Sequence, residues 1–168
     1  MKMSVKSIIS SLVLMYLLVS CDFIKDIFPN TRSNLIFKAS VSNTTNQSDT
    51  ILFSGGDIKW FNGSTGEIRF VDSMTIIQIR KYHWIKCYLD SDSLFKATVT
   101  IPTMSAIVND LVLDLNLKDG HFYFKDGYPS YIDNLGTNAI RIQNKEKRAA
   151  AWSRFIDQLK QEGRYVEK

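Results

Sequence analysis

Hydrophobic and polar residues alternate with a period of two from residue 35 onward, which predicts a domain built mainly of β-strands. Residues 35–41 form the first expected strand, and a polar loop follows at residues 43–49. Two apolar runs, residues 57–61 and 67–71, then flank the glycine-containing loop NGSTG, which predicts a hairpin. Pairing Phe61 with Glu67 sets Trp60 opposite Ile68 and Ile58 opposite Phe70, and these last four residues share one apolar face.

A second hairpin is expected over residues 109–127, NDLVLDLNLKDGHFYFKDG. Asp119-Gly120 is the type of two-residue turn that suits the twist of paired strands. This turn places leucines opposite phenylalanines on one face and brings opposite charges together on the other face. The expected pairs are Lys118–His121, Leu117–Phe122, Leu115–Phe124 and Asp114–Lys125.

The strands at residues 82–89 and 94–101 can pair in two registers. A four-residue loop buries the aromatic side chains, whose face then comprises Tyr82, Trp84, Tyr88, Phe95, Val99 and Ile101. A three-residue loop instead turns Ile85, Cys87 and Leu89 inward and leaves the aromatic residues outside. It also sets Lys86 opposite Lys96, and like charges directly opposite each other are unfavourable. The four-residue loop is therefore favoured.

The period changes near the C-terminus. Residues 139–143, AIRIQ, predict one last strand, and Asn144 is a suitable N-cap for a helix over about residues 144–163. The helix is expected to end at Gly163. Its apolar positions have helical spacing and are Trp152, Phe155, Ile156 and Leu159. This helix could lie on an anionic membrane, but covering the sheet is the favoured role.

The sequence thus predicts an α+β fold: a mainly antiparallel meander of about eight strands, forming a curved sheet or partial barrel closed by one amphipathic C-terminal helix. Residues 34–168 form the expected single domain. A strand run followed by one helix is also similar to lipocalin-like barrels, although their usual N-terminal motif is absent here.

The N-terminal residues have the pattern of a signal peptide. Lys2 and Lys6 precede an apolar run from Ile8 to Val19, which is too short to span a bilayer. Leu18-Val19-Ser20-Cys21 resembles the lipobox of bacterial lipoproteins. The resemblance implies cleavage after residue 20 and acylation of Cys21, with residues 21–33 as a membrane tether. The alternative is an ordinary secretory signal with Cys21 as a structural thiol.

Composition narrows the function further. Removing 20 of the 168 residues leaves 148, enough for one domain with its own core. The signal contains two of the 21 basic residues, so 19 basic and 17 acidic residues remain, and a net charge of +2 does not indicate a nucleic-acid partner. If Cys21 is acylated, Cys87 has no intrachain partner and is expected to be a core thiol.

No catalytic, metal or cofactor motif is evident. His83 and His121 are the only histidines, and neither has a cysteine or carboxylate beside it at metal-ligand spacing. His83 and Cys87 are too far apart along one strand to act as a base and a nucleophile. The acidic group at residues 90–93 lacks the glycine and distal glutamate of an EF-hand loop and predicts a hairpin loop. No enzyme activity is therefore expected.

Aromatic residues are the remaining binding candidates. Core packing is favoured for most of them, but Tyr82, Trp84 or Tyr123 could form an exposed binding surface if they face outward.

The lipobox, together with DIKWFNGSTGEIRF, NDLVLDLNLKDGHFYFKDGYP and AWSRFIDQLKQEGR, resembles small Bacteroidetes lipoproteins that carry no assigned activity. That resemblance also implies a short O-glycosylation pattern at Thr50, Ser73 and Ser93.

The expected function is that of a cell-envelope lipoprotein, a non-enzymatic binding or accessory module for a protein or glycan partner. The alternatives are a small-ligand carrier with a lipocalin-like cavity and, third, a hydrolytic enzyme that needs His83 or His121 near a carboxylate in a cleft. The expected location is the outer membrane, on its periplasmic or surface face, while Asp22 after Cys21 would indicate inner-membrane retention under enterobacterial sorting rules.

Overall fold

The computed structural model describes residues 33–40, 50–71, 76–130 and 136–167. The expected signal peptide, Cys21, nearly all of the tether, the expected loop at 43–49 and Ser73 lie outside these residues. The described strands are β1 Leu35–Ser40, β2 Thr50–Ser54, β3 Ile58–Asn62, β4 Glu67–Phe70, β5 Trp84–Leu89, β6 Asp92–Thr100, β7 Val112–Asn116, β8 His121–Lys125 and β9 Tyr165–Val166. The described helices are η1 Gly55–Asp57, α2 Ile76–Ile79 and α3 Thr137–Gln161.

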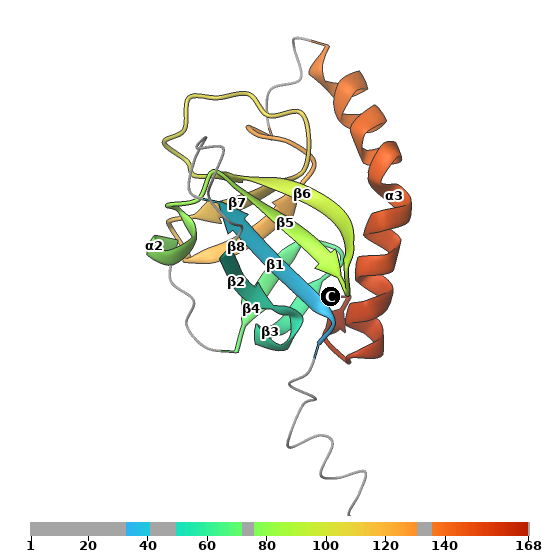
Figure 1. The fold of residues 1–168 in the computed structure, drawn as a ribbon. Helices are drawn as coiled ribbons and strands as arrows, with labels where there is room; N and C mark the ends of the chain where they lie inside the picture. The colour runs from blue at the N-terminus through green and yellow to red at the C-terminus, as the bar shows by residue number, and fades with distance from the viewer. Residues whose placement is uncertain (1–32, 41–49, 72–75, 131–135, 168) are drawn as a thin grey trace, which may run out of the picture. The chain divides into compact units, whose positions relative to one another are not determined.

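The strands form one curled sheet in the order β2-β1-β5-β6-β7-β8-β4-β3-β9, and α3 runs along one side of it (Figure 1). This confirms the α+β fold with a curved sheet and a C-terminal helix. Most strand pairs are antiparallel, as expected, but the sheet is mixed and its strand order is not that of a simple meander. Strand β7 runs parallel to β6 because residues 101–111 carry the chain back along the sheet, and β9 pairs in parallel with β3 after α3 has reversed the chain direction.

The core lies between the inner face of the curled sheet and α3. Phe155 of α3 is completely buried. Its ring contacts phenylalanines of four strands, with centroid distances of 5.4–6.2 Å to Phe37, Phe61, Phe95 and Phe124. One helical side chain therefore joins strands from both halves of the sheet.

Strands β5 and β6 take the register that sequence reasoning rejected. Cys87 pairs with Phe95 and Ile85 with Ala97, so these residues face the core and the favoured four-residue loop is wrong. The turn contains only residues 90 and 91, and a bulge follows Cys87. Asp90 has a φ of 55°, a conformation that aspartate tolerates better than most residues. Burial of apolar area on one face outweighs the like-charge pairing on the other.

Both expected hairpins form, but their pairing changes. In β7–β8, Leu115 pairs with Phe122, so the register slips by two residues and the leucines still face the phenylalanines. The turn has four residues because the Asn116 side chain accepts from the Lys118 N–H at 3.0 Å and donates to Asp119 at 2.8 Å. In β3–β4 the Ile58–Phe70 pair is confirmed. The other two pairs are wrong, because a bulge aligns Phe61 with Ile68 and Trp60 with Arg69.

Helix α3 begins seven residues earlier than Asn144, at Thr137, so the expected strand at 139–143 is wrong. The alternation there was misleading because the polar residues make the contacts: Arg141 donates to the Pro129 carbonyl at 3.0 Å and Asn144 to the Asn109 carbonyl at 2.8 Å. The C-terminal end is confirmed. Gly163 has a φ of 68°, and the Arg164 N–H donates to the Leu159 carbonyl at 2.8 Å.

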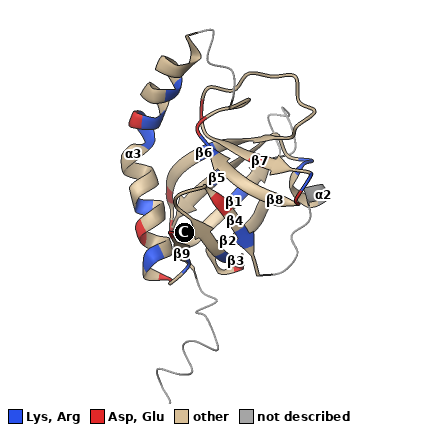
Figure 2. Ribbon diagram, turned by 180° about the vertical axis from the view of Figure 1, so that it is seen from behind, with Lys and Arg blue, Asp and Glu red and all other residues tan. Residues whose placement is uncertain are grey.

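Among the described residues, none of the helices combines the length and the apolar character needed to cross a membrane. Phe155 and Leu159 of α3 are buried in the core, and the basic and acidic residues of the helix lie interspersed along it (Figure 2).

Candidate functional site

Three lysines form a row across the outer face of the sheet. Lys38 of β1 pairs with Lys86 of β5, and Lys86 pairs with Lys96 of β6. Residues that pair directly across antiparallel strands lie on the same face, and neighbouring strands are about 4.8 Å apart. The sheet therefore presents one lysine on each of three adjacent strands. We call this set the lysine row.

The pairs Lys38–Lys86 and Lys86–Lys96 place like charges directly across neighbouring strands, and such pairs are unfavourable for sheet stability. Aromatic rings reduce this cost. The Nζ atoms of Lys86 and Lys96 lie 4.8 and 4.9 Å from the centre of the Trp84 ring, and the Nζ atom of Lys38 lies 4.7 Å from the Tyr88 ring. A ring face attracts a cation, so the aromatic residues hold the lysine side chains above the sheet.

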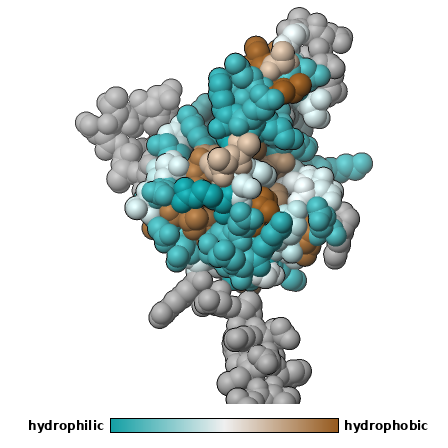
Figure 3. Space-filling view, turned by 90° about the vertical axis from the view of Figure 1, so that its right-hand side faces the viewer, coloured by the Kyte–Doolittle hydropathy of each residue, from teal (hydrophilic) through white to brown (hydrophobic). Residues whose placement is uncertain are grey.

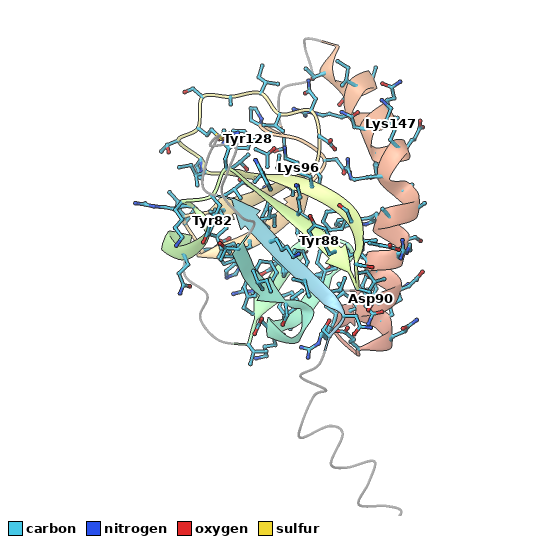
Figure 4. The ribbon with its side chains drawn as sticks, viewed as in Figure 1. Tyr82, Tyr88, Asp90, Lys96, Tyr128 and Lys147 are labelled. Carbon is cyan, nitrogen blue, oxygen red and sulfur yellow. The ribbon has the colours of Figure 1, made fainter. Side chains whose placement is uncertain are left out.

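Each side of the lysine row is flanked by an aromatic residue paired with a hydroxyl residue. Tyr88 pairs with Ser93 on one side, and Trp84 pairs with Thr98 on the other. Lys96 and Ser93 are exposed, and the rings of Trp84 and Tyr88 are half-buried. We define the lysine–aromatic face as the following seven residues: Lys38, Trp84, Lys86, Tyr88, Ser93, Lys96 and Thr98. Figure 4 labels Tyr88 and Lys96, and its view shows β1, β5 and β6 side by side at the front of the sheet.

Two acidic residues, Asp90 and Asp92, lie at the β5–β6 turn next to the lysine row. Asp92 forms an ion pair with Arg154 of α3, with 2.9 Å between the Oδ2 and NH2 atoms. Its charge is therefore balanced by the helix. Asp90 occupies the turn itself, where its N–H donates to the Asn34 carbonyl at 3.0 Å.

The structure separates the three aromatic candidates from the sequence. Trp84 belongs to the lysine–aromatic face, whereas Tyr82 is only 7% exposed and packs in the core. Tyr123 lies on β8, three strands away from β5 in the sheet order. Of the proposed O-glycosylation residues, Thr50 is exposed at the start of β2, and Ser93 is exposed on the lysine–aromatic face.

Sequence reasoning missed the three lysines and Tyr88 as a group. Lys86 and Lys96 did enter it, as a reason to reject the register that brings them together. The missed signal is that burial of Ile85 and Cys87 on the inner face can outweigh an unfavourable pair on the outer face. Lys38 could not be added from sequence, because β1 and β5 are far apart along the chain.

His121 lies in a polar cluster on another part of the sheet. Its Nδ1 atom is 2.9 Å from Oε1 of Glu67, 2.8 Å from NH2 of Arg69 and 3.3 Å from the Tyr123 hydroxyl. Burial, followed by the nearby carboxylates of Glu67 and Asp119, raises the pKa of Tyr123. His121 therefore has a carboxylate neighbour, but it lines neither the groove beside α3 nor the smaller pocket at the start of that helix.

The structure also places Cys87 and His83, the two other side chains that were considered for a chemical role. Cys87 is completely buried, and this burial raises the pKa of its thiol, so the sulfur stays protonated. His83 is exposed, and its backbone carbonyl accepts from the Val99 N–H at 3.0 Å. Within the described ranges, no group of three or more histidine, cysteine or acidic side chains is placed to hold a metal ion.

A groove of about 420 Å³ separates part of α3 from the β3–β4 loop. Trp152 and Ile156 line it, and its rim is built from ion pairs, including Arg148–Asp110 at 2.6 Å and Lys145–Asp126 at 2.9 Å. The α3 side of the molecule is mainly hydrophilic with small apolar patches (Figure 3). The space inside the curled sheet is filled by buried side chains such as Phe155, which argues against a carrier with a lipocalin-like cavity.

Among the features of the described residues, the lysine–aromatic face combines charge, aromatic surface and hydrogen-bonding groups most directly. Comparisons with protein-family models, with curated proteins and with solved structures find no match to this chain.

Proposed function

We propose that this protein is a cell-envelope lipoprotein that acts as a non-enzymatic binding module and holds an anionic protein or glycan partner on the lysine–aromatic face. The observation that carries the proposal is the lysine row. Three lysines stand next to one another on three adjacent strands of the outer face, and an anionic partner that lies across these strands would contact several of them at once.

Lipid anchoring is the second part of the proposal and rests on the lipobox resemblance of residues 18–21. Several acyl chains on one cysteine hold a protein on a membrane far more stably than one chain. Anchoring would keep the binding face near the envelope surface, where a partner of low affinity is met repeatedly.

Replacing Cys21 with serine should abolish incorporation of labelled palmitate in growing cells. Cys87→Ser is the matched control and should keep full incorporation, because that thiol is buried in the core. Mass spectrometry of the natural protein should find an acylated N-terminal peptide that begins at Cys21. Labelling of the Cys21→Ser variant, or a mature N-terminus elsewhere, would contradict the anchor.

Removing two charges of the lysine row should weaken binding of an anionic polymer. We expect Lys86→Gln with Lys96→Gln to lower the affinity of the full-length lipidated protein, in neutral detergent, for dextran sulfate by about tenfold or more. Binding of the natural protein should also weaken with added salt, because ion contacts are screened. Thermal unfolding should show that the variant is still folded.

The matched control changes two exposed lysines elsewhere, Lys118→Gln with Lys147→Gln. Figure 4 labels Lys147 on α3. This control has the same net charge as the test variant, and it should retain affinity within about twofold. Equal losses in the two variants would show that net charge, and not the lysine row, determines binding. Failure of the natural protein to bind dextran sulfate would overturn the proposed function.

A further inference from the structure

We infer that the groove between α3 and the β3–β4 loop is a second binding site, which takes a neutral sugar of one or two rings. None of the seven residues of the lysine–aromatic face lines this groove. The inference therefore goes beyond the proposed function and does not depend on it. The groove volume of about 420 Å³ lies within the range of small-molecule sites, about 300–1,000 Å³.

The groove wall that α3 contributes has an apolar row beside a polar row. Trp152 and Ile156 are four residues apart on the helix and form the apolar row, in which both side chains are half-buried. Ser153, Asp157 and Lys160 form the next row and are exposed. A sugar ring has the same two-sided character, because its C–H face is apolar and its hydroxyl groups stand around the edge.

Trp152 supplies the aromatic surface on which such a ring would stack. The centroid of its ring lies 5.3 and 5.1 Å from those of Phe95 and Phe155. The Phe61 and Phe124 rings lie at 5.9 and 5.8 Å, so core contacts fix the orientation of the indole. Among the described residues, none accepts from the indole N–H, and this nitrogen is not one of the buried polar atoms. The N–H is therefore open to a ligand.

Asp157 is the carboxylate of the groove that remains available. Asp126, the other lining carboxylate, pairs with Lys145 at 2.9 Å and also with Arg148. Within the part of the chain that the structure describes, Asp157 makes neither a hydrogen bond nor an ion pair. The two oxygens of a carboxylate can accept from two neighbouring hydroxyl groups of one sugar ring.

The β3–β4 loop forms the opposite wall, and its backbone disfavours two other classes of ligand. The N–H groups of residues 64 and 65 donate to the Asn62 side chain at 2.9 and 3.2 Å. Gly66 donates to the Asn62 carbonyl at 2.8 Å, and Gly63 donates to the Val166 carbonyl at 2.9 Å. No backbone N–H of residues 63–66 is thus left for a phosphate group or a peptide strand. The same bonds hold the wall in place, which lowers the entropic cost of binding.

The charges around the groove favour a neutral ligand. Arg148 and Lys145 are paired with two carboxylates, so these four charges cancel. Lys160 and Asp157 add one charge of each sign. The groove therefore attracts neither cations nor anions over long distances, in contrast to the lysine row. An aromatic floor, a free carboxylate and exposed hydroxyl groups without excess charge match a neutral sugar.

The test is a titration of the isotope-labelled full-length protein with neutral disaccharides, followed by NMR in a neutral detergent whose headgroup is not a sugar. The panel is maltose, cellobiose, lactose, mannobiose and chitobiose. At least one should shift the indole N–H signal of Trp152 with a Kd of about 10 mM or tighter, and leave those of Trp60 and Trp84 in place. If no disaccharide shifts the Trp152 signal, the inference is overturned.

Two matched pairs of variants on α3 locate the site. Ala149→Leu fills the groove and should weaken binding by about tenfold or more, whereas Ala150→Leu, outside the groove, should stay within about twofold. Asp157→Asn should weaken binding by about fivefold or more, because the charged acceptor is lost. Glu146→Gln removes the same charge outside the groove and should leave affinity unchanged.

All four changes are at exposed positions, and thermal unfolding shows whether each variant is folded. Equal affinities of the two leucine variants would place the sugar elsewhere and overturn the inference.

Two further comparisons test other occupants and other sites. If 1-hexanol shifts the Trp152 signal as strongly as the sugars at equal concentration, the groove takes alkyl chains and the sugar assignment is overturned. The variant Lys86→Gln with Lys96→Gln should keep its sugar affinity within about twofold, because neither lysine lines the groove. Loss of sugar binding in that variant would assign the sugar to the lysine–aromatic face instead. Loss of dextran sulfate binding alone concerns only the proposed function.

Discussion

Replacing Phe155 with alanine should lower the free energy of unfolding by about 3–5 kcal/mol, the range found for buried phenylalanines. The ring is completely buried and contacts phenylalanine rings of β1, β3, β6 and β8. Its removal leaves a cavity between α3 and both halves of the sheet. Urea unfolding followed by circular dichroism measures the change as a shift of the transition midpoint.

Ile140→Ala is the control on the same helix. Ile140 is 48% exposed, and alanine has a high helix propensity, so the change in stability should stay within about 0.5 kcal/mol. If Phe155→Ala cost less than about 1 kcal/mol, α3 would not be packed into the curled sheet as the structure has it.

Replacing Arg164 with methionine should destabilise the protein by about 3–5 kcal/mol, because it leaves a buried carboxylate without its counter-charge. The Arg164 Nε and Glu162 Oε2 atoms are 3.3 Å apart, in charge contact but without hydrogen-bond alignment, and both side chains are almost fully buried. Arg164 also donates to the Ile58 carbonyl of β3. The loss should appear in the same urea titration.

A second substitution separates charge from packing at this pair. Glu162→Gln removes the carboxylate while keeping an oxygen that can accept from Ser33, whose hydroxyl donates to Glu162 Oε1 at 2.6 Å. Combined with Arg164→Met, it should recover about half of the lost stability or more, because no uncompensated charge is then buried. A double variant as unstable as Arg164→Met alone would assign the loss to packing and to the Ile58 contact.

The two faces of the sheet differ in what they contact. The inner face binds α3 through aromatic packing, which fixes the curvature of the sheet. The outer face of β1, β5 and β6 then holds its lysines at fixed strand spacing.

Some elements could be predicted from local sequence alone. The helical spacing of Trp152, Phe155 and Leu159 identified the face of α3 that meets the sheet, and Gly163 marked its end. The faces of β7 and β8 were also correct, because a slip of two residues preserves the side to which each side chain points. Period and turn chemistry are properties of neighbouring residues, and they need no knowledge of the rest of the fold.

Other elements depended on competition between distant contacts. The AIRIQ segment alternates like a strand, yet it is helical because Arg141 and Asn144 bond to carbonyls 12 and 35 residues away. In β5–β6, a local rule about like charges gave the wrong register, since burial of Ile85 and Cys87 in the shared core is worth more than the repulsion of two solvated lysines.

The sequence by itself determined the class of the fold, the presence and the C-terminal end of its closing helix, and the expectation of a lipid anchor at Cys21. Only the tertiary structure decided which strands are neighbours, and so only it placed Lys38 beside Lys86 and Lys96. The physical reason is that strand order follows from the burial of one common core. Packing of the inner face sets the order of the strands, and that order determines which residues, including those of the lysine row, are neighbours on the outer face.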